Sequence, residues 1–366
     1  MHKHVLITGG AGFVGSSLCL AIRESLPAVK VTALDNLHRR GSELNLARLL
    51  AAGVQFVHGD VRVPSDLVSG SLNPDLVIEC SAEPSAQAGY GGSPEFLIET
   101  NLAGAYHCLE LCRKTKADII FISTSRVYPY GRLNSLPYSE SSTRFELGGV
   151  ELGGLELGDL ARGVSAKGIT EDFPLDGARS LYGTTKLAAE LLVEEYSDAY
   201  GFNFILNRFG LLTGPGQMAK ADQGVIALRV AAHYYEFPLS YIGFGGTGKQ
   251  VRDFLHIHDF CALLLDQIRN FSSYTGQRFN AGGGLANSLS LLETTELCRQ
   301  ATGNRIAIGS SPANRPADVR VYVSDYSRVE SITGWKPRIG ACQTISDIHT
   351  WLESGGEVLR QAMLGG

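Results

Sequence analysis

The chain has 366 residues, of which 44% are hydrophobic and 19% charged, proportions typical of a soluble globular protein and far from those of disordered or fibrous chains. The net charge is −5 and no long run of Lys or Arg occurs, which argues against nucleic acid or a membrane surface as a partner. No window is apolar and long enough to be a signal peptide or to span a bilayer, so we expect a cytoplasmic protein.

Short apolar runs alternate with helical patterns in the first third of the chain. The runs cover residues 4–8, 31–35, 54–60, 75–81 and 118–124, and the helical patterns lie near 14–25, 42–52 and 94–114. Continuously apolar runs are typical of strands buried on both faces of a parallel sheet. Because parallel neighbours need a crossover connection, the alternation predicts an α/β fold with a doubly wound parallel (Rossmann) sheet.

The later part of the chain is patterned more loosely. A helix at 182–200 and a strand at 203–210 are followed by loops rich in Gly, Pro and aromatic residues. Helical patterns interrupt these loops near 222–236, 257–269, 289–301 and 341–353. We interpret this part as a smaller C-terminal lobe.

Residues 145–159 read FELGGVELGGLELGD and repeat Glu-Leu-Gly with a period of five. A period of five fits neither a helix nor a strand, so it produces no sustained apolar face. The segment is predicted to be a mobile acidic surface loop, with a lid over the active site as the alternative.

Cysteine and histidine patterns indicate no metal site. The seven cysteines are scattered without a C-x-x-C pair, which is typical of reduced packing residues. His256 and His258 stand two apart, and we interpret them as alternating loop or helix-cap residues rather than as metal ligands.

The stretch TGGAGFVG follows the first predicted strand directly. Its Gly9, Gly12 and Gly15 permit a tight turn and let backbone N–H groups and a helix N-terminus approach a pyrophosphate. Asp35 lies 20 residues past Gly15, at the end of the second strand. A carboxylate there accepts a hydrogen bond from an adenosine ribose 2′-OH and repels a 2′-phosphate, so we predict NAD as the cofactor.

Further residues complete the predicted cofactor site. Asp60 ends the third strand, and it is placed with Val61 to face the adenine. Arg39 and Arg40 could in principle host the 2′-phosphate of NADP. The predicted cofactor contacts are Gly9, Gly12, Phe13, Val14, Gly15, Asp35, Asn36, Arg39, Asp60, Val61, Ser81, Ala82, Asn101 and Lys186.

Tyr182 and Lys186 stand four residues apart at the start of a predicted helix, so their side chains share a face. A free phenol with a pKa of about 10 is a poor base at neutral pH, but a nearby ammonium and an oxidised nicotinamide favour the phenolate. Leu187 and Leu191 lie about 100° around the helix and are predicted to anchor it in the core.

Hydroxyl side chains follow the strand at 118–124. The sequence ISTSRVY places Ser123, Thr124 and Ser125 at the carboxyl edge of the predicted sheet. One of these hydroxyls could hydrogen-bond a substrate hydroxyl while Tyr182 takes its proton. These three residues, Tyr182 and Lys186 are the predicted catalytic residues.

Together these stretches resemble the extended short-chain dehydrogenase/reductase family of NAD-dependent sugar-nucleotide epimerases and dehydratases. The resemblance is carried by TGGAGFVG, DN at 35–36, STSRVY and YGTTK, and it runs from about residue 4 to residue 353. Within the family the chain is similar to enzymes that invert C2 of CDP-hexoses. That similarity is carried by DNLHRRGSELNLARL (35–49), FVHGDVR (56–62), ADQG (221–224), GTGKQVRDFLHIHD (246–259) and NSLSLLE (287–293).

The resemblance implies a role for each matching residue. Tyr182 corresponds to the catalytic base, Lys186 to its pKa-lowering and ribose-binding partner, and Thr124 to the hydroxyl that hydrogen-bonds the sugar. Arg252 is similar to the arginine that grips the substrate pyrophosphate, with a core salt bridge to aspartate 253 or 259 as the alternative. The implied substrate contacts are Glu83, Arg126, Asn207, Gln217, Gln223 and Arg252.

The implied domains follow the same resemblance. We expect an NAD-binding Rossmann domain at 1–206, with 251–284 returning to it, and a sugar-nucleotide-binding lobe at 207–250 and 285–366. Relatives commonly pair through two long helices, here about 94–114 and 182–200, so a homodimer is expected. The expected partner is a small-molecule nucleotide sugar.

The implied reaction is inversion of C2 of a CDP-hexose through a transient keto intermediate, an isomerase reaction of carbohydrate biosynthesis. Inversion of C4 is the nearest alternative, followed by a dehydrogenase or reductase with net hydride transfer. A non-catalytic NAD-binding regulator is a different class. Such proteins usually lose the tyrosine or the lysine, and this chain keeps both.

Two stretches depart from the family pattern. ECSAEPS (79–85) replaces an HLAGQ-like run and puts Glu83 where an amide is usual, which leaves the substrate open. STSRVY lacks the Asp-Glu pair that dehydratases place after the threonine, and also the glutamate of decarboxylating relatives. Without an acid and a base at these positions, neither elimination nor decarboxylation is expected.

Overall fold

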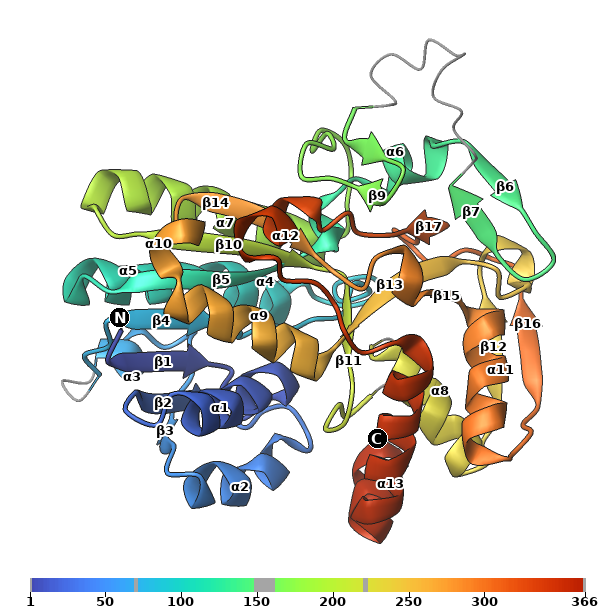
Figure 1. Cartoon of the computed structure of the whole chain (residues 1–366), viewed down its shortest axis with the longest axis horizontal. Helices are drawn as coiled ribbons and strands as arrows, with labels where there is room; N and C mark the ends of the chain where they lie inside the picture. The colour runs from blue at the N-terminus through green and yellow to red at the C-terminus, as the bar shows by residue number, and fades with distance from the viewer. Residues whose placement is uncertain (1, 69–71, 148–161, 220–222, 365–366) are drawn as a thin grey trace. The chain divides into compact units, whose positions relative to one another are not determined.

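A computed structural model describes residues 2–68, 72–147, 162–219 and 223–364 (Figure 1). The chain divides into two compact units. Unit 1 comprises Met1–Thr124, Leu181–Arg208 and Phe260–Phe279, and unit 2 comprises Ser125–Ser180, Phe209–Asp259 and Asn280–Gly366. Residues 125–180, expected within 1–206, thus fall in unit 2. None of the described helices is long and apolar enough to cross a membrane.

Unit 1 is built on a seven-stranded sheet with the order β14-β10-β5-β4-β1-β2-β3. The pairs β1·β2, β2·β3, β1·β4 and β4·β5 are parallel. The strands are β1 His4–Thr8, β2 Lys30–Asp35, β3 Gln55–His58, β4 Leu76–Glu79, β5 Asp118–Thr124, β10 Phe204–Phe209 and β14 Gln277–Ala281. The predicted strands and the doubly wound fold are therefore confirmed. Strand order reverses between β1 and β4, where ligands bind in such sheets.

Helices accompany the sheet of unit 1 on both faces, because successive residues of a buried strand point to opposite sides. Leu6, Val77 and Phe121 join a core cluster with α5 and α7, whereas Val5 and Ile7 are buried on the other side. The helices are α1 Phe13–Ser25, α2 Leu46–Ala51, α3 Pro64–Val68, α4 Glu95–Ile98, α5 Gly104–Thr115, α7 Leu181–Tyr200, α9 Ile257–Arg269 and α10 Phe271–Tyr274, with a 3₁₀ turn η1 at Ser42–Asn45.

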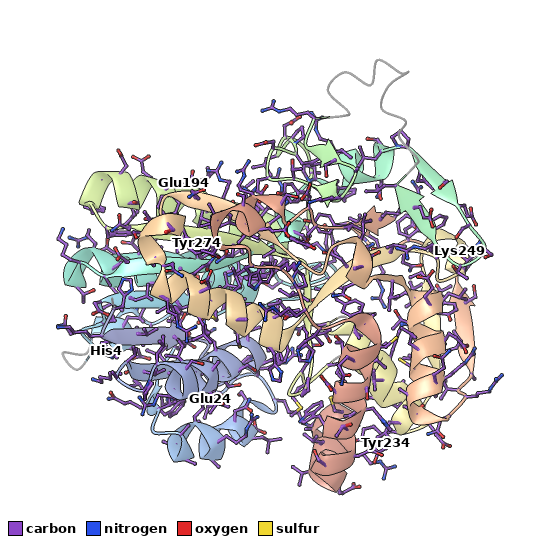
Figure 2. The ribbon with its side chains drawn as sticks, in the orientation of Figure 1. His4, Glu24, Glu194, Tyr234, Lys249 and Tyr274 are labelled. Carbon is purple, nitrogen blue, oxygen red and sulfur yellow. The ribbon has the colours of Figure 1, made fainter. Side chains whose placement is uncertain are left out.

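The face that α7 buries differs from the prediction. Ala189 and Val193 pack into the core cluster, whereas Leu191 is 60% exposed and Leu187 only half-buried. The expectation that Leu187 and Leu191 anchor the helix is wrong for Leu191, because the helix turns its small residues to the sheet. On its surface, Glu194, labelled in Figure 2, pairs with Arg278 of β14.

Unit 2 combines short strands with a helical cluster. β13 Val251–His256 pairs with β11 Leu211–Thr213, with β15 Ser288–Ser290 and with β17 Val321–Tyr322. β12 Leu239–Ile242 pairs with β16 Ile308–Ser311, and the hairpins β6 Tyr138–Glu140·β7 Phe145–Leu147 and β8 Val164–Ser165·β9 Gly168–Ile169 are antiparallel. Three helices, α8 Val225–Tyr234, α11 Leu291–Thr302 and α13 Ala341–Leu364, share one apolar core.

Remaining details of unit 2 bear on the predictions. α6 Tyr130–Ser135 and α12 Ser327–Thr333 complete its helices, with 3₁₀ turns η3 Ser125–Val127, η5 Phe244–Gly246 and η6 Leu285–Asn287. α13 is broken at Gly356, which has a non-helical φ of 53°. The predicted surface loop at 145–159 begins as strand β7, and its residues from 148 onward lie outside the described residues.

Candidate functional site

The Gly-rich turn between β1 and α1 brings its backbone segments into close contact. Gly9 has a φ of +63°, and a Cβ on Gly15 would lie 2.2 Å from the carbonyl oxygen of Gly9. Gly12 is the N-cap of α1, where a Cβ would lie 3.2 Å from the same oxygen. The first N–H groups of a helix lack partners within it and attract anions. The turn therefore suits a phosphate group. Phe13 and Val14 form the first turn of α1 and are half-buried.

Asp35 ends β2 beside this turn. Its carboxylate oxygens accept hydrogen bonds from the backbone N–H groups of Ala11 (3.0 Å) and Leu37 (2.8 Å). Burial raises the pKa of Asp35, against the lowering effect of these N–H donors. A carboxylate has about four lone-pair sites, so Asp35 retains acceptor capacity for a ribose hydroxyl. The glycines and Asp35 together fit a dinucleotide.

The predicted adenine side of the cofactor site is polar and well ordered by hydrogen bonds. The side-chain N–H of Asn36 donates to Asp60 (2.8 Å), and Arg62 binds Asp60 with a closest distance of 2.6 Å. Burial alone would raise the pKa of Asp60, but the bonds from Arg62 and Asn36 lower it to about 2. Val61 is buried, and the backbone carbonyl of Arg39 accepts from Ser42.

Asn101 ties the segment after β4 to α7. It sits in a π-helical stretch, η2 Glu99–Ala103, that joins α4 to α5. Its side chain accepts from the backbone N–H of Glu83 (2.8 Å), donates to the backbone carbonyl of Glu83 (3.1 Å) and donates to Thr185 Oγ1 (3.3 Å). The preceding Ser81 is buried and Ala82 is half-buried. The Glu83 carboxylate accepts from the backbone N–H of Ser85.

Lys186 lies on the same face of α7 as Tyr182, one turn further on, and its side chain is 3% exposed. Its ammonium is 3.2 Å from the carboxylate of Glu79, at the end of β4, and 4.6 Å from the centre of the Phe121 ring. The negative charge of a Tyr182 phenolate would raise the pKa of Lys186, as the charge of Glu79 does. The structure thus brings the predicted tyrosine and lysine together and adds an unpredicted carboxylate.

The three predicted hydroxyls at the end of β5 have different surroundings. Ser123 is buried and donates to Glu190 at 2.5 Å, and Glu190 in turn binds Arg208 of β10 with a closest distance of 2.6 Å. Thr124 is the last residue of β5 and is 8% exposed. Ser125 begins unit 2 and lines its pocket.

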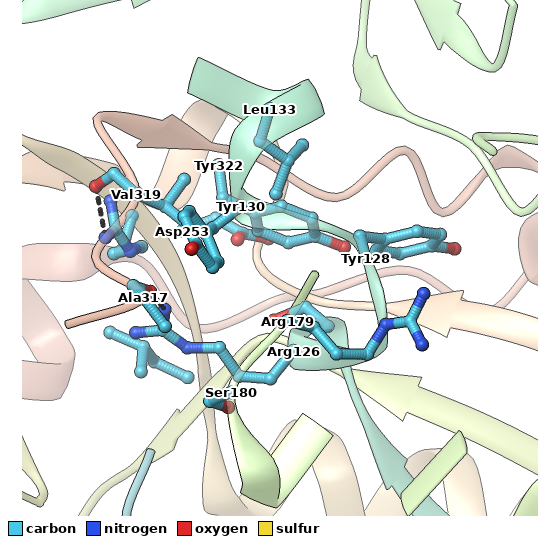
Figure 3. Close-up of a pocket in the computed structure, with 13 residues that line it drawn as sticks. Arg126, Tyr128, Tyr130, Leu133, Arg179, Ser180, Asp253, Ala317, Val319 and Tyr322 are labelled. Carbon is cyan, nitrogen blue, oxygen red and sulfur yellow. Dashed lines mark hydrogen bonds between the residues drawn. The ribbon is translucent and has the colours of Figure 1, made fainter. Parts of the chain in front are cut away.

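Unit 2 contains a pocket of about 450 Å³, counting space open to solvent (Figure 3). Ser125, Arg126 and Arg252 line it, as do several residues that were not predicted. Arg126 reaches toward Ala317 and donates to its carbonyl oxygen at 3.2 Å. The unpredicted lining residues are Tyr128, Tyr130, Leu133, Arg179, Ser180, Leu211, Asp253, Ala317, Val319 and Tyr322.

Arg252 is anchored by the chain segment after Ala317. It donates to Asp318 at 3.0 Å and to the carbonyl oxygens of Val319 and Val251. Burial lowers the pKa of Arg252 to about 10, with Asp318 opposing and Arg126 reinforcing this shift. The alternative interpretation expected a core salt bridge from Arg252 to Asp253 or Asp259. Those partners are wrong, because the ion pair of Arg252 is with Asp318.

The three predicted amide contacts are held in different ways. Asn207 is fully buried in unit 1, where it exchanges two hydrogen bonds with Gln267 (2.9 and 2.8 Å). In unit 2, Gln217 donates to the carbonyl oxygen of Leu212 and accepts from Thr213. Gln223 is half-buried at the edge of the described residues. None of the three lines the pocket of unit 2.

The residues missed by sequence reasoning had weak signals. Glu79 ends the apolar strand LVIE, so a charged residue at the end of a buried strand was a readable clue to a polar site, although not to its partner. Arg179 lies three residues before Tyr182 but belongs to no motif. Val319 and Tyr322 reach the pocket only through the fold of unit 2, so no spacing in the sequence could have indicated them.

Known proteins match the chain over nearly its whole length. The profile of the NAD dependent epimerase/dehydratase family matches residues 5–148 and 156–282. The chain is 30% identical over 358 residues to CDP-paratose 2-epimerase of Salmonella typhi, covering 96% of this chain and 99% of the relative. It is 26% identical over 358 residues to dTDP-glucose 4,6-dehydratase of Actinoplanes sp., covering 95% and 97%.

The fold agrees with these matches. The structure of UDP-glucuronic acid 4-epimerase from Bacillus cereus, in complex with UDP-glucuronic acid and NAD, aligns with a TM-score of 0.77 at 21% identity. The alignment covers 96% of this chain and 99% of that one. The expected family resemblance is thereby confirmed. Because the family profile covers well over half of the sequence, the chain belongs to the NAD-dependent epimerase/dehydratase family, as an enzyme with NAD as its cofactor.

Proposed function

We propose that the protein inverts C2 of the hexose in a CDP-hexose, through a transient ketone at that carbon. The observation that carries the proposal is the Tyr182–Lys186 pair, with the lysine buried beside the tyrosine at the carboxyl end of the sheet. The choice of C2 and of CDP is supported by the similarity to CDP-paratose 2-epimerase, which extends over almost the whole of both chains.

Tyr182 acts in this proposal as the acid and base. Its phenolate removes the proton of the C2 hydroxyl, holds it while the carbon is a ketone, and returns it after the sugar has turned over. NAD, when bound by the Gly-rich turn and Asp35, supplies the acceptance and return of hydride at C2. Lys186 stabilises the phenolate by its charge. Thr124 positions the sugar hydroxyl by a hydrogen bond.

The two other serines have distinct proposed parts. Ser123 is bound to Glu190, which suits a residue that supports the end of β5 better than one that contacts substrate. Ser125 and Arg126 stand where dehydratases carry an Asp-Glu pair. Neither side chain is a carboxylic acid, so both acid and base for elimination of a hydroxyl are missing at these positions.

The proposed substrate contacts draw on the arginines of the pocket. Arg126 and Arg252 bring two guanidinium groups to its lining, and a planar guanidinium binds phosphate oxygens in a bidentate manner. This supports a nucleoside diphosphate as the occupant. Glu83, Gln217, Gln223 and Asn207 remain predicted contacts. To contact substrate, the side-chain amide of Asn207 would have to give up its hydrogen bond with Gln267.

The proposal is tested with a panel of CDP-, GDP- and UDP-hexoses incubated with the purified protein, followed by NMR analysis of the sugar. Inversion of C2 in a CDP-hexose is expected. Inversion of C4 would establish the nearest alternative instead. Net formation of NADH or consumption of NADH would indicate a dehydrogenase or reductase.

Heavy water gives a second result from the same experiment. Hydride return leaves the inverted carbon free of solvent deuterium, whereas removal of a carbon-bound proton would introduce it. Deuterium at the inverted carbon would therefore refute the proposed mechanism even if the expected epimer formed.

The homodimer and the cytoplasmic location expected from the sequence belong to this proposal. Tyr106 of α5 and Leu191 and Tyr200 of α7 are at least 41% exposed, which supports pairing through these two helices. A monomeric mass in light scattering at micromolar concentration would refute the dimer.

A further inference from the structure

Glu79 is a carboxylate in the interior of unit 1. It is the last residue of β4, and its side chain is 1% exposed. Charged side chains are almost never fully buried unless they are paired. The partner of Glu79 is the Lys186 ammonium at 3.2 Å, and that group has the face of Phe121 4.6 Å away. The lysine is thus held between a carboxylate on β4 and an aromatic ring on β5.

The electrostatics of this pair are strong because water is excluded. Burial raises the pKa of Glu79, and the Lys186 charge opposes that rise. Burial alone would lower the pKa of Lys186, but the Glu79 carboxylate turns the shift upward. The charge of each partner therefore favours the charged form of the other. Removing one partner would leave an uncompensated buried charge.

Other titratable groups near the pair do not replace Glu79. The thiols of Cys80, the residue after β4, and of Cys108 on α5 interact electrostatically with Glu79, and burial raises the pKa of each well above its ordinary value, so both stay neutral. Glu190, one turn along α7 from Lys186, binds Arg208. The remaining group that interacts with Lys186 electrostatically is the phenol of Tyr182.

We propose that Glu79 is a positioning residue that holds the Lys186 ammonium in place and partly offsets its charge, so that it sets the pH at which Tyr182 ionises. This inference rests on the proposed function, in which Tyr182 and Lys186 serve the proton transfer. An ion pair stabilises a neighbouring phenolate less than a lone ammonium does, because the carboxylate repels the phenolate.

The test is an ultraviolet titration of the NAD⁺-loaded protein, which needs no substrate. The chain has 14 tyrosines, so the phenolate signal of Tyr182 is obtained by subtracting the titration of a Tyr182→Phe variant. In Glu79→Gln the amide oxygen can still accept from Lys186 but carries no charge. We expect the midpoint of the Tyr182 signal to fall by about one pH unit.

Glu79→Asp is the matched control, since it keeps the charge and shortens the side chain. Its midpoint is expected to stay close to that of the wild type. An unchanged midpoint in Glu79→Gln would overturn the inference. An equal fall in both variants would also overturn it, because packing rather than charge would then be responsible.

Two smaller neutral variants keep the test decisive if Glu79→Gln does not fold. Glu79→Asn and Glu79→Thr also remove the carboxylate charge and leave an oxygen that can accept from Lys186. Each of these variants that folds is expected to show the lower midpoint, and an unchanged midpoint would overturn the inference.

Failure of the proposed function is recognised separately. Full turnover by Tyr182→Phe would remove the proposed function, while the titration would still report whether Glu79 acts on Tyr182. With a substrate in hand, both limbs of the pH–rate profile of Glu79→Gln should move to lower pH, because the lost carboxylate raised the pKa of Lys186 as well. Limbs that stay in place would contradict the inference.

Discussion

Alanine substitutions at Gly12 and Gly15 should separate cofactor binding from folding. At Gly15 the new Cβ would lie 2.2 Å from the carbonyl oxygen of Gly9 and 2.8 Å from the Cα of Gly10, and neither backbone atom can rotate away. Overpacking of this kind costs about 3 kcal/mol or more. At Gly12 the Cβ would lie 3.2 Å from that oxygen, and the φ of −68° is ordinary for alanine. The cost to folding is then about 1 kcal/mol or less.

Gly12 is a predicted contact of the NAD phosphate groups, and the same Cβ is expected to obstruct that contact. At an NAD concentration 100 times the wild-type Kd, binding stabilises the wild type by about 2.7 kcal/mol. If Gly12→Ala weakens binding a hundredfold, the stabilisation falls to about 0.4 kcal/mol under the same conditions.

Urea unfolding of cofactor-free protein, with and without added NAD, measures both quantities. Gly15→Ala should lose stability in both conditions, and Gly12→Ala mainly in the presence of NAD. Gly131→Ala is the control, because a Cβ there meets nothing within 4 Å. A Gly12→Ala variant that NAD stabilises as strongly as the wild type would refute phosphate binding by the Gly-rich turn.

Three further predictions concern stability and assembly. Arg208→Met should lower the free energy of unfolding by about 3–5 kcal/mol, because it leaves the buried Glu190 carboxylate without its cationic partner. Adding Glu190→Leu should restore most of the lost stability, as measured by urea unfolding. A double variant that is no more stable than Arg208→Met would contradict this prediction. Leu191→Glu should convert the proposed dimer to a monomer, as measured by light scattering. Val358→Glu is the control, since Val358 of α13 is similarly exposed, and it should leave the dimer intact. Equal effects of the two substitutions would exclude an interface through α7. Asp60 has a folded-state pKa of about 2, so the stability it contributes is present above its unfolded pKa of about 3.9 and is lost as the pH falls toward 2. The urea midpoints of wild type and Asp60→Asn should therefore converge in that range, and a constant difference would argue against the shift.

Elements with a strong local pattern were predictable. The apolar runs of β1, β2, β4 and β5 can only be buried between two layers of helices, so their pattern already implies a parallel sheet. The turn at Gly9 to Gly15 was predictable because its backbone contacts exclude a side chain. The four-residue spacing of Tyr182 and Lys186 places them on one helix face wherever that helix lies.

Which face of a helix is buried depends on its neighbours, and here prediction failed. Leu191 was expected in the core, but α7 packs through Ala189 and Val193 and leaves Leu191 exposed. Small residues let α7 lie close to the sheet and to α5. The sequence of α7 carries no information about the shape of these neighbours. The same limit applies to Phe145, which lies in strand β7, paired with β6, where a loop was predicted.

The sequence by itself determined the α/β class, the dinucleotide turn, the acid after β2 and the tyrosine–lysine pair, because each depends on residues close together in the chain. Tertiary structure alone decided that Glu79 meets Lys186, 107 residues away, and that Asp318 rather than a neighbouring aspartate pairs with Arg252. Such contacts join residues from separate strands and loops. The charge around a buried group is set by whatever the whole fold brings to it, and spacing along one element carries no information about that.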